Sequence, residues 1–215
     1  VIRTIVILLL LSCAAQGQIL DNSECSVFSD DPFFNSRFID NNRICMIHGE
    51  ISDKRLKDII RETEKEINYS FDPQGRLVKK EEYLKLPGDM MDTAIVVYLY
   101  DDQDRLVCMR KNDGYGFFSY YYEYNEEGFI TSEKYCRNPE MTAETPLGTE
   151  VPGKEFVIAS ETYQYERIND TLVKRKTFNN YGKQYQETFM YWNNLGYKVK
   201  EETRLLITNK RITVE

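Results

Sequence analysis

The chain has 215 residues, a formal net charge of −7 and an unusually aromatic composition that includes 16 tyrosines. This length allows one or two domains with a real hydrophobic core. The acidic balance argues against nucleic acid as a partner, because nucleic-acid binding depends on Lys and Arg side chains that neutralise phosphates. For the same reason, direct docking on an anionic membrane surface is disfavoured.

The first segment has the features of an export signal. A basic residue precedes an apolar run at 5–11, and small residues follow a stretch that is too short to span a membrane. Residues 10–13 resemble a bacterial lipobox, which would place a lipid on Cys13, and this route is favoured over ordinary cleavage before residue 18. We therefore expect a signal peptide over 1–17. The mature protein is predicted to be an outer-membrane lipoprotein, or periplasmic or extracellular, and to touch the membrane only through its N-terminal lipid.

Export also permits disulfides, because the compartments outside the cytoplasm are oxidising. Without Cys13 the chain has four cysteines, which allow three pairings. Proximity in sequence favours Cys25 with Cys45 and Cys108 with Cys136. The alternative for Cys108 is a buried thiol, since this residue lies within an apolar strand pattern.

The segments before the first clear hairpin are less patterned. Residues 18–50, rich in Asp, Asn and Ser, are predicted to form an irregular lead-in. Residues 51–67 are ambiguous, because their apolar positions follow helical spacing although they run directly into the strand-like stretch 67–71. A strand is favoured from Arg61 onward.

A short turn pattern then recurs: an aromatic residue, an acid or Asn, two variable residues, and Gly, Asp or Asn. Six segments fit it, at 71–75, 100–104, 124–128, 165–169, 178–182 and 192–196. Asp or Asn at the first turn position caps the backbone two residues on, and the fourth position needs a left-handed backbone, which Gly adopts cheaply. A type I turn followed by such a residue makes a three-residue hairpin. The predicted turn-forming residues are Asp72, Gly75, Asp101, Asp104, Asn125, Gly128, Asn179, Gly182, Asn193 and Gly196.

The flanks of these turns have the composition of strands. Residues 95–99 are apolar on both faces, as a central strand should be, and a further hairpin is predicted around Asn209 and Lys210. Residues 138–154 contain three prolines and two glycines and predict a long loop. The sequence thus predicts an all-β fold over 51–215. Its hairpins are expected to form an antiparallel meander in a curved or partly rolled sheet.

Three of the hairpins resemble a known repeat. The stretches Tyr69–Leu77, Tyr98–Leu106 and Tyr122–Ile130 are similar to the tyrosine–aspartate (YD, Rhs-type) repeat of bacterial secreted and surface proteins. The resemblance extends over residues 65–203 and weakens in the later units. It implies hairpin architecture and an exported setting, as in small exported YD-like proteins of Bacteroides-type bacteria. It implies no activity, because fold and function travel separately.

Catalytic patterns are scarce. His48 is the only histidine, and no phosphate-binding loop, dinucleotide motif or nucleophile elbow is present. We expect no cofactor and no metal. The aromatic surplus is more suggestive: Tyr120, Tyr122 and Trp192 would bind a partner if one sheet face were left uncovered, and cross-strand packing is the alternative.

These observations predict a non-enzymatic exported module for binding or scaffolding. It would act through a sheet face or the long loop, on a protein or glycan in the cell envelope or outside the cell. The alternatives are a periplasmic or surface glycan hydrolase that uses carboxylates, and an immunity or envelope-assembly partner.

Overall fold

The structure is a computed structural model that describes residues 34–54, 56, 59–86, 90–113, 116–139 and 154–214. The predicted signal peptide, Cys13, Cys25 and all but the ends of the predicted loop at 138–154 lie outside these residues. One short helix, α2 (Ser36–Asn41), precedes the strands β1 (Met46–Lys54), β2 (Ile60–Phe71), β3 (Leu77–Leu86), β4 (Met90–Tyr100), β5 (Leu106–Asp113), β6 (Gly116–Tyr124), β7 (Ile130–Asn138), β8 (Phe156–Asn169), β9 (Leu172–Asn179), β10 (Gln184–Trp192), β11 (Lys198–Leu205) and β12 (Arg211–Val214).

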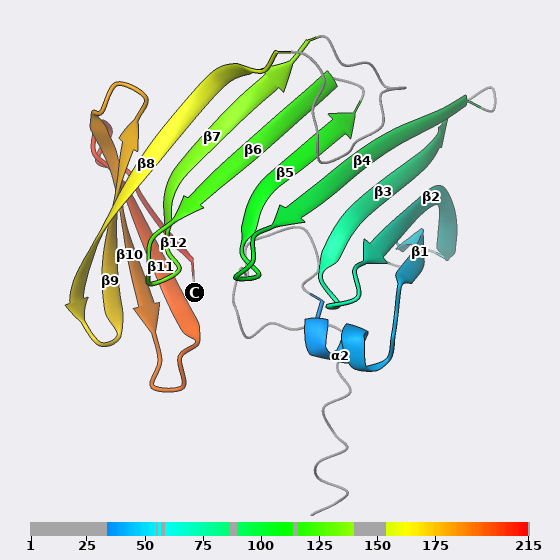
Figure 1. The fold of residues 1–215 in the computed structure, drawn as a ribbon, viewed down its shortest axis with the longest axis horizontal. Coiled ribbons are helices and arrows are strands. Elements are labelled where there is room, and N and C mark those ends of the chain that lie inside the picture. The colour runs from blue at the N-terminus through cyan, green and yellow to red at the C-terminus, as the bar shows by residue number, and fades with distance from the viewer. Residues whose placement is uncertain are drawn as a thin grey trace, which may run out of the picture.

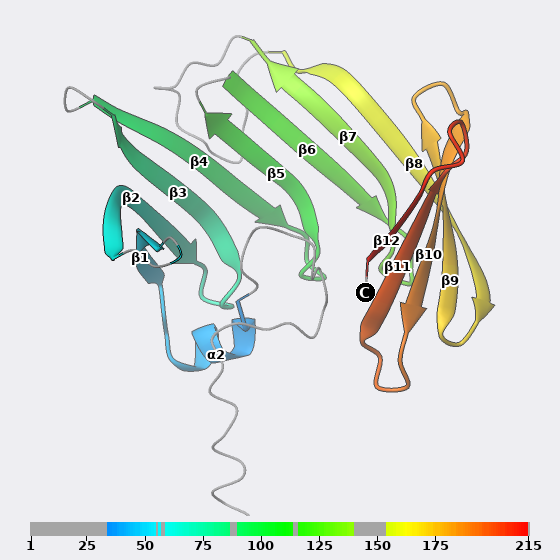
Figure 2. The same ribbon diagram turned by 180° about the vertical axis from the view of Figure 1, so that it is seen from behind.

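The strands form a single 12-stranded antiparallel sheet in the order β1 to β12. Each strand pairs only with the strands next to it in the sequence, so the predicted all-β antiparallel meander is confirmed. Figure 1 shows β3–β7 side by side in one broad twisted layer, with β8–β12 turned out of its plane, and Figure 2 shows the same bend from behind. The right-handed twist between neighbouring strands accumulates over such a width and makes the sheet curve.

The segment 18–50 is not irregular throughout, because it contains α2 and the start of β1, so that prediction is wrong for its second half. The helix begins at a cap: the Asn35 side chain accepts a hydrogen bond from the backbone N–H of Phe38 at 3.0 Å. Ile39 is the anchor of the helix and is fully buried. None of the described residues forms a helix of the length and apolarity needed to cross a membrane.

Within the ambiguous segment 51–67, β1 includes the residues up to Lys54 and β2 those from Ile60 onward. The favoured strand is therefore correct. The helix-like spacing is misleading because the apolar residues that produce it are at the exposed end of the hairpin. Leu56 and Ile59 are 94% and 72% exposed.

The strand register divides the side chains between two faces. One face, here the cysteine face, carries Cys108 and Cys136 on β5 and β7. The opposite face, here the tyrosine face, carries Tyr120 and Tyr122 on β6 and, through β7, Tyr163 on β8. In the described residues no second layer of strands covers either face.

Burial moves from one face to the other along the sheet. In β5–β7 the most buried side chains are on the cysteine face, whereas in β9 and β10 they are on the tyrosine face, at Val173, Thr177, Thr188 and Met190. Fully burying an apolar side chain such as Val173 stabilises a fold by about 1.5–3 kcal/mol. The sheet thus has two small buried clusters. One lies on the cysteine face of β5–β7, and the other lies on the tyrosine face of β9 and β10.

Cys108 and Cys136 are buried free thiols, so the predicted disulfide between them is wrong. They lie on β5 and β7 with β6 between them, and a strand spacing of about 4.8 Å puts their Cα atoms on the order of 10 Å apart. A disulfide needs Cα atoms within about 7 Å. The alternative of a buried thiol is correct, and burial raises the pKa of Cys108 to about 11. Cys45 is an exposed free thiol, and its predicted partner Cys25 lies outside the described residues.

The segment 165–169 is a strand rather than a turn. β8 continues to Asn169, and the chain reverses through Asp170 and Thr171. The side-chain oxygen of Asn169 accepts hydrogen bonds from the N–H and the hydroxyl of Thr171, at 3.0 and 3.1 Å. Asn169 therefore opens a two-residue turn instead of closing a longer one.

Candidate functional site: an aromatic hollow beyond a tyrosine ladder

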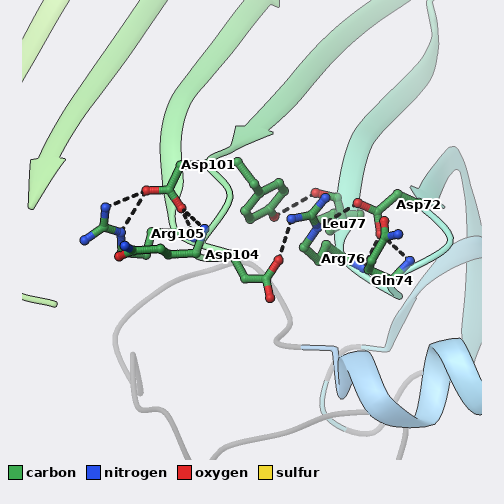
Figure 3. A network of polar contacts seen from close by, with 9 residues as sticks. Asp72, Gln74, Arg76, Leu77, Asp101, Asp104 and Arg105 are labelled. Carbon is green, nitrogen blue, oxygen red and sulfur yellow. Dashed lines mark hydrogen bonds and ion pairs between the residues drawn. The ribbon is translucent and has the colours of Figure 1, made fainter.

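The first repeat turn satisfies its own polar groups. One oxygen of Asp72 accepts hydrogen bonds from the backbone N–H groups of Gln74 and Arg76 at 3.0 and 2.9 Å, and the other accepts from the Arg76 Nε at 2.7 Å (Figure 3). Gly75 has a φ of +77°, the left-handed conformation that glycine adopts without strain. Asp101 makes the equivalent contacts in the next turn. These acids are turn caps and have little capacity left for a ligand.

The later turns use the same geometry with Asn in place of Asp. The side-chain oxygen accepts backbone hydrogen bonds in the turns that begin at Asn125, Asn179 and Asn193. The fourth turn position is left-handed at Asp104, Gly128, Gly182 and Gly196. The repeated motif therefore specifies hairpin geometry, at one end of the sheet for the turns at Asn125 and Asn193 and at the other end for the turn at Asn179, which joins β9 to β10.

Three tyrosines bond back to the first residue of the strand that follows one of the first three turns. The hydroxyl groups of Tyr100, Tyr124 and Tyr165 donate hydrogen bonds to the main-chain carbonyls of Leu77, Leu106 and Ile130, at 2.8, 2.7 and 2.7 Å. We call these three residues the tyrosine ladder. Burial raises the pKa of Tyr100 to about 12, so the hydroxyl remains a donor at any physiological pH.

Side chains from the preceding turn cover the ladder rings. Arginine guanidinium groups lie over the first two, at 4.9 Å from the ring centroid for Arg76 on Tyr100 and 5.1 Å for Arg105 on Tyr124. At the third step Phe129 replaces arginine and stacks on Tyr165, with ring centroids 4.6 Å apart. Such cation–π and stacking contacts contribute on the order of 0.5–1.5 kcal/mol each. The tyrosine ladder thus stabilises the sheet. The side chain that covers the tyrosine ring is arginine in the first two steps and Phe129 in the third.

Beyond Tyr165 the ladder position is held by Trp192, which has no hydroxyl. Its backbone N–H donates to the carbonyl of Thr171 at 2.8 Å. A hollow of about 490 Å³ opens here, lined by Phe129, Arg167, Asp170, Thr171, Val173, Trp192, Asn193, Asn194 and Gly196. A second hollow of about 520 Å³ shares Phe129, Trp192 and Gly196 with the first and extends past Tyr165, Arg175, Met190 and Lys198. The two adjoin, and together we call them the aromatic hollow.

Three cationic side chains line the aromatic hollow, and two of them form ion pairs with glutamates. Arg167 pairs with Glu127 at 3.1 Å, and Lys198 pairs with Glu201 at 2.9 Å. The Nε of Arg175 is buried and has no hydrogen-bond acceptor among the described residues. The Arg175 guanidinium lies over the Tyr163 ring, with its central carbon 5.1 Å from the ring centroid.

Arg175 also lies next to a pair of carboxylates on the tyrosine face. The Tyr163 hydroxyl is 3.2 Å from an oxygen of Glu133 and 2.8 Å from one of Glu161, and Tyr185 donates to Glu161 as well. Burial raises the pKa of Glu133, and the negative charge of Glu161 adds to that shift. Two carboxylates that share one tyrosine hydroxyl, one of them with a raised pKa, are a combination that acid–base chemistry uses, so this cluster bears on the hydrolase alternative.

The residues predicted to bind a partner do not form one site. Trp192 lines the aromatic hollow. Tyr120 instead packs on Tyr135 with ring centroids 4.9 Å apart, and burial raises the pKa of Tyr122. Tyr120 and Tyr122 therefore take part in cross-strand packing in the middle of the sheet, as the alternative interpretation held.

Sequence reasoning missed Phe129, Arg167 and Asp170 as lining residues. A signal for Phe129 was present, because the residue after the left-handed position is arginine in the first two units and phenylalanine in the third. Arg167 and Asp170 gave no such signal, since their unit was assigned the wrong turn.

Possible metal ligands are dispersed in the part of the chain that the structure describes. No group of three or more His, Cys, Asp or Glu side chains there lies close enough to hold a metal ion. His48 is exposed on β1, and its Nδ1 lies 2.7 Å from the side-chain oxygen of Asn68.

No protein-family model matches the chain, and no curated protein matches it. Among solved structures, it is similar to a protein of unknown function from Bacteroides fragilis NCTC 9343, with 13% sequence identity, 81% of this chain and 92% of that chain covered, and a TM-score of 0.22. A likeness at this level carries no argument about fold or function.

Proposed function

We propose that the protein is an exported, non-enzymatic binding module whose aromatic hollow binds a glycan. The observation that carries the proposal is the combination of Trp192 and Phe129 with the polar side chains of Asp170, Asn193 and Asn194 around one hollow. The CH faces of a sugar ring stack on aromatic rings, while carboxylate and amide groups hydrogen-bond its hydroxyls.

The size and polarity of the hollow favour a sugar over an apolar peptide. Ligand sites commonly occupy about 300–1,000 Å³, a range that includes the 490 Å³ hollow. Its rim includes the polar side chains of Asp170 and Asn194, which suit a ligand rich in hydroxyls. Arg175 lines the adjoining hollow and adds a positive charge there.

Binding to a panel of soluble glycans, measured by isothermal titration calorimetry, tests the proposal. Trp192→Ala is expected to weaken binding of any glycan that the wild type binds by about tenfold or more, because losing a stacking contact of about 1.4 kcal/mol has that effect. Tyr181→Ala is the matched control, since Tyr181 is an aromatic turn residue that is 87% exposed and outside the hollow. Unchanged affinity in folded Trp192→Ala would show that the hollow is not the site.

The exported setting rests on residues 1–17 and is proposed together with the lipid anchor. Metabolic labelling with a palmitate analogue should mark the wild-type protein and leave Cys13→Ala unmarked. Equal labelling of the two would refute the anchor without touching the glycan proposal.

A carboxylate-dependent glycan hydrolase is the second candidate, favoured by Glu133 and Glu161 within reach of one tyrosine hydroxyl. Glycosidases that retain stereochemistry hold two carboxylates about 5 Å apart. If the wild type hydrolyses a glycan and both Glu133→Gln and Glu161→Gln abolish turnover, this candidate replaces the binding module. Absence of turnover across the panel removes it.

A further inference from the structure

The second of the two adjoining hollows is lined by positive charge, although the chain as a whole is acidic. Its charged lining residues are Arg175 on β9 and Lys198 on β11, and none of its described lining residues is an acid. The formal net charge of the chain is −7. The first hollow is balanced by contrast, since Arg167 and Asp170 both line it. A cleft lined by one sign of charge concentrates ligands of the opposite sign, so the second hollow favours a negative group.

The carboxylates near these two cations lie outside the aromatic hollow. The Lys198 Nζ is 2.9 Å from an oxygen of Glu201, which lines neither hollow. Beside Arg175, Glu133 and Glu161 contact the same tyrosine hydroxyl, and neither of them is a lining residue. Burial raises the pKa of Glu133, so this carboxylate is more easily neutralised than an exposed one. The charged groups that a ligand meets inside the second hollow are therefore cationic.

Trp192 connects the cationic part of the site to its sugar-binding part. Its side chain lines both hollows, and on the neighbouring strand Lys198 stands directly opposite it. Residues opposite each other on antiparallel strands have Cβ atoms about 4.5–5.5 Å apart. A sugar ring stacked on Trp192 would thus bring a group attached to that ring close to the Lys198 ammonium. The hydroxyls on its other side would face the first hollow, at Asp170.

We propose that the glycan bound in the aromatic hollow is acidic, and that Arg175 and Lys198 hold its carboxylate or sulfate group while Trp192 stacks on the ring. The inference rests on the proposed function, because it names the class of glycan for the same site. Carboxylate and sulfate oxygens accept charge-assisted hydrogen bonds from both cations, and the guanidinium fork binds such groups through two parallel bonds. The acidic remainder of the chain repels the same ligand, which confines its binding to the hollow.

Two pairs of probes that share a sugar backbone and differ in charge test the inference by isothermal titration calorimetry. Oligogalacturonate is compared with its fully methyl-esterified form, and maltohexaose sulfate with unmodified maltohexaose. The acidic form of at least one pair should bind about tenfold more tightly or better, because a hydrogen bond to a charged group contributes that much. The pair that shows the preference identifies carboxylate or sulfate as the group recognised. The preference should shrink as salt is added.

Two substitutions of opposite sign assign the preference to the hollow. Lys198→Gln should remove most of the preference for the acidic form, whereas Glu201→Gln, which removes the partner of Lys198, should increase it. Lys183→Gln is the matched control: it makes the same charge change at an exposed position in the turn between β9 and β10, at the other end of the sheet, and should keep the preference. If Lys198→Gln does not fold, Glu201→Gln alone decides.

The outcomes separate this inference from the proposed function. A wild type that binds none of the neutral or acidic glycans refutes the glycan site, and the inference with it. Binding of the neutral forms as tightly as the acidic forms overturns only the inference. An equal loss of preference in Lys198→Gln and Lys183→Gln would also overturn it, because the effect would then come from net charge. So would a Glu201→Gln variant that binds the acidic form no better than the wild type.

Discussion

Gly75 offers the sharpest test of how the repeat turns support the fold. A methyl group built at Gly75 would lie 2.1 Å from the carbonyl oxygen of Ser36 and 2.9 Å from the backbone nitrogen of Asp40, both on α2. Gly128 occupies the same turn position with a φ of +84°, and a methyl group there meets nothing within 4 Å. The two glycines thus share backbone conformation and differ in their surroundings.

The expected magnitudes follow from that difference. A left-handed alanine costs roughly 1–2 kcal/mol, and this penalty applies to Gly75→Ala and Gly128→Ala alike. Overpacking against groups that cannot rotate away adds roughly 1–3 kcal/mol, and only at Gly75. Gly75→Ala should therefore lower the free energy of unfolding by about 2–5 kcal/mol, against about 1–2 kcal/mol for Gly128→Ala.

Urea unfolding of the two variants measures the difference, and amide exchange at Ile39 reports whether α2 has moved away. A displaced helix would lower the cost at Gly75 but would speed exchange at Ile39, which is fully buried in the native protein. Equal destabilisation of the two variants to within about 0.5 kcal/mol, with unchanged exchange at Ile39, would refute the packing of α2 on this turn.

Three further predictions follow from the ladder, the carboxylate pair and the thiols. Tyr124→Phe removes a ladder hydrogen bond and should cost about 1 kcal/mol in urea unfolding, whereas Tyr181→Phe, at an exposed turn, should cost almost nothing. Burial raises the pKa of Glu133 in the folded state, so the wild-type protein gains stability as pH falls through that pKa. Glu133→Gln removes the buried charge and should be more stable than wild type at neutral pH. Unfolding curves over a pH series should show this difference shrinking as pH approaches the ordinary pKa of 4.5. Iodoacetamide labelling of the native protein, read by peptide mass spectrometry, should modify Cys45 and spare Cys108, and rapid labelling of both would contradict the burial of Cys108.

The turns were predictable because their chemistry is local. Asp72 and Gly75 determine a hairpin through contacts within five successive residues, which the printed sequence already shows. The turn near Asn169 was misplaced because Asn suits two positions in a turn. The pattern put Asn169 at the fourth position, whereas in the structure it caps the turn from the first position. The helix α2 was missed because it is only six residues long, too short for an apolar period to show, and it packs on a turn far along the chain.

The candidate site was only partly predictable. Trp192 stood out by residue type, but Phe129 and Asp170 join it through the order of the strands in the sheet, which brings the ends of β6, β8 and β10 together. The disulfide prediction failed for a related reason. Cys108 and Cys136 share a face and are close in sequence, yet the strand between them keeps their thiols apart, and only the strand register reveals that.

The nearest-neighbour order of the strands makes this molecule a linear array, in which each strand pairs only with the strand before it and the strand after it. In arrays of this kind, stability is close to a sum over units and their contacts, and folding can begin at any sound unit and spread. Duplication of one hairpin before β6 would then add two strands to the sheet and one tyrosine to the tyrosine ladder. The residues that line the aromatic hollow would keep their neighbours. The architecture therefore sets no fixed number of hairpins, and the length of such a protein can change in evolution by whole hairpins.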